Sequence, residues 1–504
     1  MARSWRGLAA VVLAALASGC GHGLGGRPVV IAARSSPSTL DPHLHNELDV
    51  WSLLCNFYDS LVEFDARMKI RPALAVSWRR VDSAHMRFEL RRGVRFQDGE
   101  PFTAADVVAS YLRALGHPRT GIRHLLRGIV AMRALGPYEL EVETDGPAPT
   151  LLNRLALLFV VPERQSRVDE ITAPVGTGSY RFVRRRSDGS VVAEAWDGWR
   201  GRPKIAEVEF HFIDSDEERG AGFLAGRYDI AVPISEDDAA AVRRHPGLRT
   251  QLQPTLLVRL LMVVPDAALG RTRAALSDPR VRRAMLLAID RDHLVDEVLE
   301  GNATVASQFI HPVVFGFDPG IAPLPCDPVE SRRLLAEAGF ADGFDVELVH
   351  GGLGAGLISA VVNDLARIGV RVRVREAPLA QLLQEARDRT VPLFTLSRMC
   401  TTGDAAELFD SSLHSIDPLH GYGGENYGGY SNPAVDEALD RAGRELDPAQ
   451  RLLLLQRAQR VALTELPILP LVVRWEHMGL SSRLEVVPRH DAWLRVADFR
   501  LRSP

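Results

Sequence analysis

The chain has 504 residues, too many for one compact core, so two or three subdomains are expected. Its 60 basic residues nearly balance its 64 acidic ones, and the formal net charge of -4 gives no sign of a nucleic-acid-binding protein. The composition, 46% hydrophobic, is that of a soluble globular protein.

The N-terminus has the pattern of a secretory signal peptide. Two arginines precede the apolar run Leu8–Leu16, which is shorter than the ~20 apolar residues of a membrane-spanning helix. The small residues before Cys20 resemble the lipobox of bacterial lipoproteins, in which this cysteine is acylated; the alternative is a plain secreted protein cleaved nearby. We therefore expect a signal peptide over residues 1–19 and a lipidated tether over residues 20–28.

The first strand of the mature chain is expected at Val29–Ala33, and Thr39-Leu40-Asp41-Pro42 leaves it through a turn. The carboxyl end of such a strand is where an α/β lobe meets its ligand. This turn is therefore the first candidate for a binding wall.

The segment Phe88–Leu112 contains signals for a strand, a turn and a helix in succession. Apolar residues alternate with Arg and Gln up to Phe96, as in a half-buried strand, and Asp98-Gly99 supplies a tight turn. Thr103 can cap the free amides of the following helix, and the carboxylate of Asp106 suits the helix dipole.

Two later segments have clear periodicity. Asp278 and Pro279 begin a helix with an apolar i, i+3, i+4 stripe, which indicates a core-facing helix rather than a cofactor site. Phe344–Val349, a helix near Val361–Ile368 and the strand Val370–Val374 form a βαβ unit.

Motifs of catalysis are missing from the sequence. G-x-S-x-G, H-E-x-x-H, the S-x-x-K set and the P-loop do not occur, and Ser179 is interpreted as a turn residue rather than a nucleophile. The loop Gly351–Gly356 lacks the G-x-G-x-x-G spacing, so a structural turn is favoured over a dinucleotide site.

Metal and redox sites have weak support. His43 and His45 could ligate a metal together, but without nearby carboxylates or thiolates they are interpreted as loop histidines. No C-x-x-C spacing exists, and a bridge from Cys326 to either Cys55 or Cys400 stays open.

The chain resembles the extracytoplasmic solute-binding proteins of family 5, which serve dipeptide, oligopeptide and nickel ABC importers. The segments that carry the resemblance follow the family order and cover nearly the whole mature chain. They are Ser38–Leu44, Leu61–Asp65, Arg71–Trp78, Phe88–Leu112, Pro174–Phe182, Ser277–Gly301, Leu334–Phe344 and Tyr430–Leu439.

This resemblance implies an α/β chain with the two-lobed periplasmic binding protein fold (type II, cluster C) and an extra subdomain inserted in the first lobe. Lobe I is expected over residues 29–260, including the insert at about 46–173, and lobe II over residues 261–473. Residues 474–504 are expected to return to lobe I. The apolar strand Leu256–Val264 is expected to cross between the lobes.

The resemblance also implies where specificity is determined. Peptide-binding relatives carry a Trp, then Cys or a small residue, then an Asp two places on that pairs with the α-ammonium of the ligand. Here Met399 replaces the Trp, Cys400 matches, and Thr402 occupies the Asp position. Asp404 is the nearest carboxylate, and it either contacts the ligand or only ends a strand or caps a helix.

Tyrosines on a glycine-rich loop suit a cleft for amphipathic solutes, and this adds Asn426 and Tyr427 to the second wall. The expected ligand-binding residues are Ser36, Leu40 and Asp41 on one wall and Met399, Cys400, Thr402, Asp404, Asn426 and Tyr427 on the other.

The expected function is capture of a peptide or peptide-like solute by hinge closure and its delivery to ABC permease and ATPase subunits. The resemblance implies a monomer, anchored by lipid in the periplasm or at the cell surface, that is not an enzyme. We expect no cofactor, metal or nucleic acid. The alternatives are a binding protein for a nickel chelate, an oligosaccharide or another small solute, and a sensory or chaperone-like lipoprotein on the same fold.

Overall fold

The computed structural model describes residues 27–352 and 355–502. The signal peptide and the lipidation site Cys20 fall outside these residues. Among the described helices, none has the length and apolar character needed to cross a membrane.

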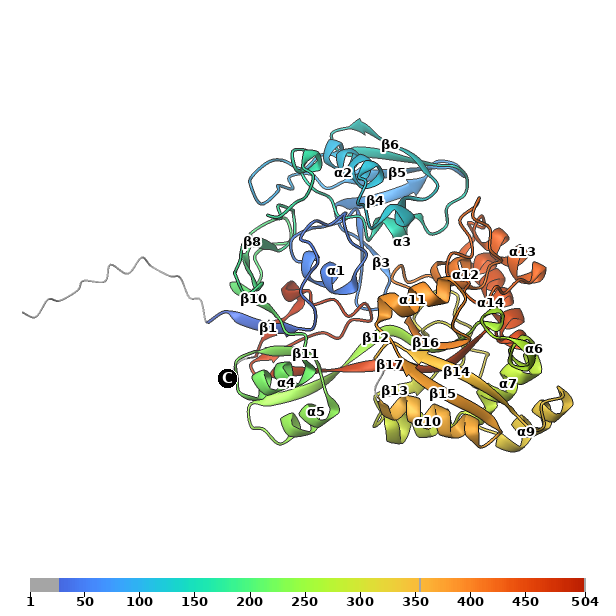
Figure 1. The fold of residues 1–504 in the computed structure, drawn as a ribbon. Coiled ribbons are helices and arrows are strands. Elements are labelled where there is room, and N and C mark those ends of the chain that lie inside the picture. The colour runs from blue at the N-terminus through green and yellow to red at the C-terminus, as the bar shows by residue number, and fades with distance from the viewer. Residues whose placement is uncertain (1–26, 353–354, 503–504) are drawn as a thin grey trace, which may run out of the picture.

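An eleven-stranded sheet runs through the molecule and carries both lobes (Figure 1). In lobe I, β1 lies parallel to β10 on one side and to β11 on the other, and two antiparallel strands extend the sheet. These elements are β1 Val29–Ala33, β8 Tyr180–Arg185, β9 Val191–Ala195, β10 Glu207–Phe212 and β11 Ile230–Ile234, with helices α4 Asp216–Leu224 and α5 Glu236–Arg243.

Lobe II is built on three mutually parallel strands, with β14 between β15 and β16. The strands are β14 Phe344–His350, β15 Val370–Glu376 and β16 Leu393–Arg398. The helices of this half are α6 Gly270–Ser277, α7 Pro279–Ala288, α8 Arg291–His293, a π-helical turn Leu294–Val298, α9 Pro328–Glu337, α10 Ala355–Ala366, α11 Leu379–Arg387, α12 Ala406–Ser412, α13 Pro433–Ala442 and α14 Pro448–Glu465.

Two long antiparallel strands, β12 Leu248–Val263 and β17 Ile468–Ser481, cross from one lobe to the other (Figure 1). In lobe I, β17 pairs with β11, and in lobe II, β12 pairs with β16. The short strand β13 Ala303–Val305 pairs with the middle of β17. The expected lobe boundaries at residues 260 and 473 fall within these two strands.

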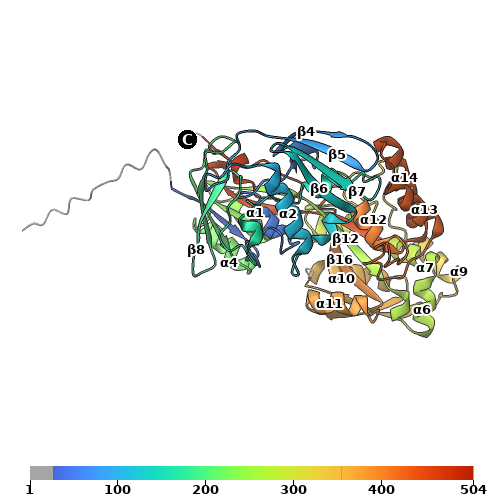
Figure 2. The ribbon, with the colours of Figure 1, turned by 90° about the horizontal axis from the view of Figure 1, so that it is seen from above.

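A separate four-stranded sheet forms the inserted subdomain, which extends toward α12 of lobe II in the view of Figure 2. The strand order is β4-β5-β7-β6, and α2 packs on β6. The elements are β4 Ala75–Arg80, β5 His85–Leu90, α2 Ala104–Gly116, β6 Ile129–Gly136, β7 Glu139–Thr144 and α3 Leu151–Leu155. Next to them lie α1 Leu48–Leu54, β2 Val62–Phe64, β3 Ile70–Pro72 and two short 3-10 turns, Arg123–Leu126 and Gln165–Arg167. A third 3-10 turn, Pro265–Ala267, follows β12 and contacts α6 in lobe II.

The local predictions for this subdomain are confirmed with one correction. Thr103 precedes α2, and the carboxylate of Asp106 accepts a hydrogen bond from the Thr103 amide at 2.8 Å. Gly99 has a positive φ of 93°, as the turn requires. The strand, however, ends at Leu90, because the next segment forms only an isolated bridge between Arg95 and Pro101.

The C-terminal segment lies against lobe I. It contains β18 Leu484–Glu485, a 3-10 turn Val496–Asp498 and β19 Arg500–Leu501. The buried amide of Asn56 donates to the carbonyl of Leu494 at 3.0 Å, and Arg489 donates to the carbonyl of Phe64 at 3.0 Å. Lobe II has its own hydrophobic core, which contains the apolar stripe of α7.

Candidate functional site

The middle of the crossing strands is the point where the two lobes meet. The pairing of β12 with β17 is irregular between Pro254 and Val258. Around this irregularity the side chains of Leu257, Arg474 and Trp475 are only half-buried, whereas the strands are buried on the lobe II side. We name this mid-span region, residues 254–259 and 473–477, the interlobe junction.

The carboxyl ends of parallel strands from both lobes reach the interlobe junction. After β1, Arg34 lies 4.0 Å from Glu476 of β17, which places the end of this strand on the junction. At the last residue of β16, Arg398 pairs with Val258 of β12. Ligands of α/β proteins bind beyond the carboxyl ends of such strands, so the junction has the geometry of a binding site.

Of the residues expected on the first wall, Ser36 is exposed and Leu40 and Asp41 are buried. The Ser36 hydroxyl accepts a hydrogen bond from Arg185 at 3.1 Å. Asp41 forms a buried ion pair with Arg113 and accepts two backbone amides, so each of its carboxylate oxygens already has two donors. Contact of Asp41 with a solute remains a prediction.

The second wall begins in the loop after β16. Met399 is half-buried and Cys400 is a buried free thiol, whose pKa burial raises well above its ordinary value. The Thr402 hydroxyl and amide both donate to Glu407, at 2.7 and 2.8 Å. Asp404 is buried and paired with Arg451 at 2.6 and 2.8 Å. The conformation of this loop is therefore stabilised by two carboxylates, Glu407, which accepts from Thr402, and Asp404, which pairs with Arg451.

Asn426 and Tyr427 are both buried, and they lie together beside a cavity of about 350 Å³. The Asn426 amide donates to the carbonyls of His414 and Tyr430 and accepts the Tyr430 amide, which fixes the glycine-rich loop. The Tyr427 ring packs edge-on against Phe394 with centroids 5.5 Å apart. Their contact with a solute likewise stays a prediction.

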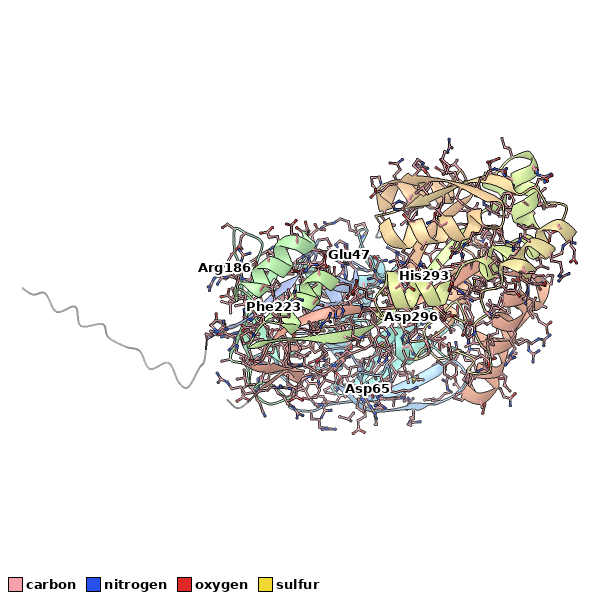
Figure 3. All side chains as sticks on the ribbon, turned by 90° about the horizontal axis from the view of Figure 1, so that it is seen from below. Glu47, Asp65, Arg186, Phe223, His293 and Asp296 are labelled. Atoms are coloured by element: carbon pink, nitrogen blue, oxygen red, sulfur yellow. The ribbon has the colours of Figure 1, made fainter. Side chains whose placement is uncertain are left out.

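Two residues of the inserted subdomain donate hydrogen bonds to lobe II, and neither could be predicted from the sequence. Asn153 of α3 donates from Nδ2 to the carbonyl of Thr402 at 2.7 Å. Arg127 donates to the carbonyl of Gly421 at 2.9 Å. The inserted subdomain thus contacts the loop that carries Met399 to Asp404. In Figure 3, seen from below, Phe223 marks lobe I and His293 marks the side of lobe II that faces it.

Comparison with known proteins agrees with this geometry. The model of the family described as bacterial extracellular solute-binding proteins, family 5, matches residues 69–417. The chain belongs to this family. It is a substrate-binding protein of the kind that serves ABC importers, and as predicted from the sequence it is not an enzyme.

Curated relatives of this solute-binding protein align along almost its whole length. The glutathione-binding protein GsiB of Shigella dysenteriae is 27% identical over 482 residues, which cover 92% of this chain and 91% of the relative. GsiB of Escherichia coli O1:K1 is 28% identical and covers 89% of both chains.

Solved structures confirm the predicted two-lobed periplasmic binding protein fold. CtaP of Listeria monocytogenes superposes with a TM-score of 0.84 at 18% identity, covering 95% of this chain and 99% of its own. HbpA2 of Haemophilus parasuis has a TM-score of 0.81 at 21% identity, covering 95% and 100%. At these identities the likeness shows the fold alone.

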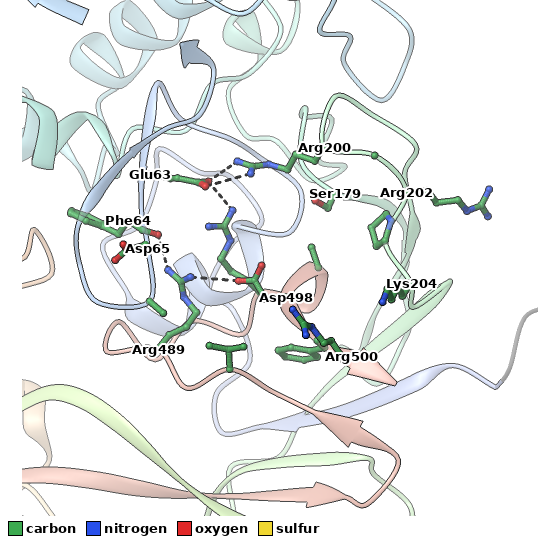
Figure 4. Close-up of a pocket in the computed structure, with 17 residues that line it drawn as sticks. Glu63, Phe64, Asp65, Ser179, Arg200, Arg202, Lys204, Arg489, Asp498 and Arg500 are labelled. Carbon is green, nitrogen blue, oxygen red and sulfur yellow. Dashed lines mark hydrogen bonds and ion pairs between the residues drawn. The ribbon is translucent and has the colours of Figure 1, made fainter. Parts of the chain in front are cut away.

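Besides the cavity next to Asn426 and Tyr427, the solute-binding protein has a pocket within lobe I, between β2 and the C-terminal segment (Figure 4). Its volume is about 820 Å³, and ion pairs hold its wall: Arg200 and Arg495 contact Glu63 at 2.6 and 2.8 Å. Arg489 lies 3.5 Å from Asp498. These pairs tie the chain end to the body of lobe I.

Both histidines considered for a metal have a hydrogen-bond partner in the fold, although Nε2 of His45 is buried without one in the described chain. His43 is fully buried, with Nε2 2.9 Å from the carbonyl of Phe159, so it is not the loop histidine expected from the sequence. Within the described ranges no cluster of His, Cys, Asp and Glu could hold a metal ion. Cys55, Cys326 and Cys400 are all free thiols, so neither disulfide forms in this structure.

Acid is expected to destabilise the protein through three buried histidines. Burial lowers the pKa of His43, His45 and His311 from 6.5 to about 4. Between these values the unfolded chain binds protons that the folded chain does not, so stability falls as pH drops from 6.5 to 4. Melting curves at pH 7.0, 5.5 and 4.5 measure this, and His43→Gln should flatten the dependence while His245→Gln, at an exposed site, should not. A constant melting temperature over this range would contradict the prediction.

Proposed function

We propose that this chain captures a peptide or peptide-like solute at the interlobe junction and delivers it to an ABC permease with its ATPase subunits. The observation that carries the proposal is the meeting of the carboxyl ends of β1 and β16 on the crossing strands. Family membership and relatives described as glutathione-binding support a small peptide as the solute. A structural neighbour, DppA of Helicobacter pylori, is described in complex with the peptide STSA.

Hinge closure is the proposed mechanism. A solute that contacts both lobes stabilises the closed form, which is the form that a permease recognises. The hydrogen bonds from Asn153 and Arg127 to lobe II join the same two parts of the molecule. We assign them to the closed form, with Ser36, Met399 and Thr402 as the expected solute contacts at the edges of the junction.

Mass spectrometry of solute released from natively purified protein tests the solute class. A small peptide or glutathione is the expected result, and calorimetry with glutathione then gives its affinity. Recovery of a metal chelate or a sugar, with no peptide, would overturn the proposal.

The cross-lobe hydrogen bonds give a test of closure. Asn153→Ala and Arg127→Ala are each expected to weaken solute affinity about 2- to 10-fold, because one hydrogen bond worth ~0.5–1.5 kcal/mol disappears from the closed form only. Calorimetry measures the change, and Arg202→Ala, an exposed site in lobe I, is the matched control. Unchanged solute affinity in both variants would show that these hydrogen bonds do not stabilise the closed form, and would contradict the assignment.

Membrane attachment through acylated Cys20 is part of the same proposal. Cys20→Ser is expected to move the protein from the membrane fraction to the soluble extract, as seen by immunoblotting after fractionation. A variant that stays with the membrane would rule out this anchor.

A further inference from the structure

The buried arginines of the chain follow one rule with one exception. Seven arginines are buried among residues 27–352 and 355–502, and six of them donate to carboxylates or backbone carbonyls of the chain. The six are Arg113, Arg219, Arg282, Arg291, Arg451 and Arg489. The exception is Arg259 of β12, which is 7% exposed. Its guanidinium donates no hydrogen bond to the described part of the chain, and its Nε is buried without a partner there.

The charge that acts on Arg259 has the same sign and belongs to Arg474. Arg474 of β17 is half-buried, and its Nε is also without a partner among residues 27–352 and 355–502. Burial, with the Arg474 charge added to it, lowers the pKa of Arg259 to about 9. Removing a guanidinium from water without a counter-charge costs several kcal/mol, so a protein retains such a pair only where something compensates for it.

The strand register places both arginines on one face of the sheet at the interlobe junction. Arg259 lies opposite Val472 on β17, and Arg474 is two residues further along that strand, so their side chains leave the same face. On its other side Arg259 faces Ser397, at the carboxyl end of β16.

Further unsatisfied groups lie on this face. Thr395 pairs with Leu261 and is buried, and its hydroxyl has no partner in the part of the chain that the structure describes. The pairing of Val349 with Phe394 puts His350 next to Thr395, and Nδ1 of His350 is equally without a partner there. Polar groups without a partner in the described chain thus gather beside the end of β14 and the middle of β16.

We propose that Arg259 and Arg474 form a subsite for a carboxylate of the solute. This inference rests on the proposed function and narrows its solute class to acidic peptides and peptide-like acids. Two guanidinium groups offer planar pairs of N–H donors that match the two oxygens of a carboxylate. Thr395 and Ser397 would add hydroxyl donors beside it. Glu476, the carboxylate nearest in sequence to Arg474, forms no ion pair with either arginine in the described chain and lies 4.0 Å from Arg34 of lobe I.

Calorimetry with glutathione and with its diethyl ester, whose carboxylates are capped, tests the subsite. The wild-type protein is expected to prefer the free acid about 30-fold or more, the fold-change of a buried charge pair that loses one partner. Arg259→Met is expected to lose this preference. Arg202→Met should retain it, because that exposed side chain lies in lobe I.

The melting temperature of solute-free variants shows whether an arginine serves solute binding or stabilises the fold. Arg259→Met removes an uncompensated buried charge, so its melting temperature should stay level or rise. Arg291→Met should melt lower, because the carbonyls of Ala306 and Pro470 lose their donor. A large loss of stability in Arg259→Met would assign Arg259 to the fold and overturn the subsite.

Thermal unfolding in the presence of succinate, a small dianion, tests the subsite even if no peptide binds. If succinate raises the melting temperature of the wild type but not of Arg259→Met, the carboxylate subsite stands while the peptide function fails. If peptides bind equally well with capped carboxylates, in wild type and variant alike, the subsite fails and the peptide function stands. If neither succinate nor any free acid gives an Arg259-dependent effect, the inference is wrong.

Discussion

Asp41→Asn is expected to lower the free energy of unfolding by about 3–5 kcal/mol, because it leaves the buried guanidinium of Arg113 without its counter-charge. Asp41 is 0% exposed and Arg113 7% exposed, and their side chains form two hydrogen bonds. The other donors to Asp41 are the amides of His43 and Ile171, at 3.0 and 2.8 Å. This carboxylate therefore joins the chain after β1, the helix α2 and the segment before β8.

The pH dependence of this contribution has a defined sign. Burial by itself would raise the pKa of Asp41, but the hydrogen bonds from Arg113 and from the two amides outweigh it and hold the pKa below 3.8. The stabilisation is therefore present above pH 3.8 and is lost as the pH falls below that value.

Urea unfolding of wild type and Asp41→Asn at pH 7 measures the loss, with Ser36→Ala as the control on the same segment. Ser36 is exposed, so its variant should stay within ~0.5 kcal/mol of the wild type. An Asp41→Asn protein of wild-type stability that has lost solute affinity would instead show that Asp41 contacts the solute.

Helices and strands that are determined by residues adjacent in the sequence could be predicted. The strand Val29–Ala33 has its expected bounds, and Asp278 caps α7 by accepting the Arg280 amide at 2.8 Å. The βαβ unit of lobe II was predicted because strand and helix periods alternate there. The crossing strand Leu256–Val264 proved to begin at Leu248, since its pairing with β17 extends it into lobe I.

The partners of the site carboxylates Asp41 and Asp404 could not be predicted, because they lie far away in the sequence. Arg113 is 72 residues from Asp41, and Arg451 is 47 residues from Asp404. Nothing near Asp404 shows that its carboxylate is already occupied. Likewise Arg259 stands in an apolar strand, and its lack of a partner becomes visible only when every neighbouring strand is in place.

Gln97→Leu is expected to cost about 3 kcal/mol of stability, because buried backbone groups lose their partner. Gln97 is 4% exposed and donates from Nε2 to the carbonyls of Phe57, Gly178 and Tyr180, at 3.2, 3.1 and 2.7 Å. Its Oε1 accepts the amide of Gly176 at 3.0 Å. One side chain thus joins Phe88–Leu112 to Pro174–Phe182, two segments that carried the family resemblance.

Gly176 packs closely against the same backbone carbonyl, that of Phe57, to which Gln97 donates. A Cβ at this position would lie 2.1 Å from the carbonyl oxygen of Phe57, so Gly176→Ala should also be strongly destabilising. Because both changes disrupt the same contact, the double variant should lose less than the sum of the two. Urea unfolding of the single and double variants tests this, with Glu100→Gln, at an exposed site of the same loop, as the control. If the two losses of stability add exactly, Gln97 and Gly176 stabilise the fold independently. The two segments would then not be coupled through a shared contact.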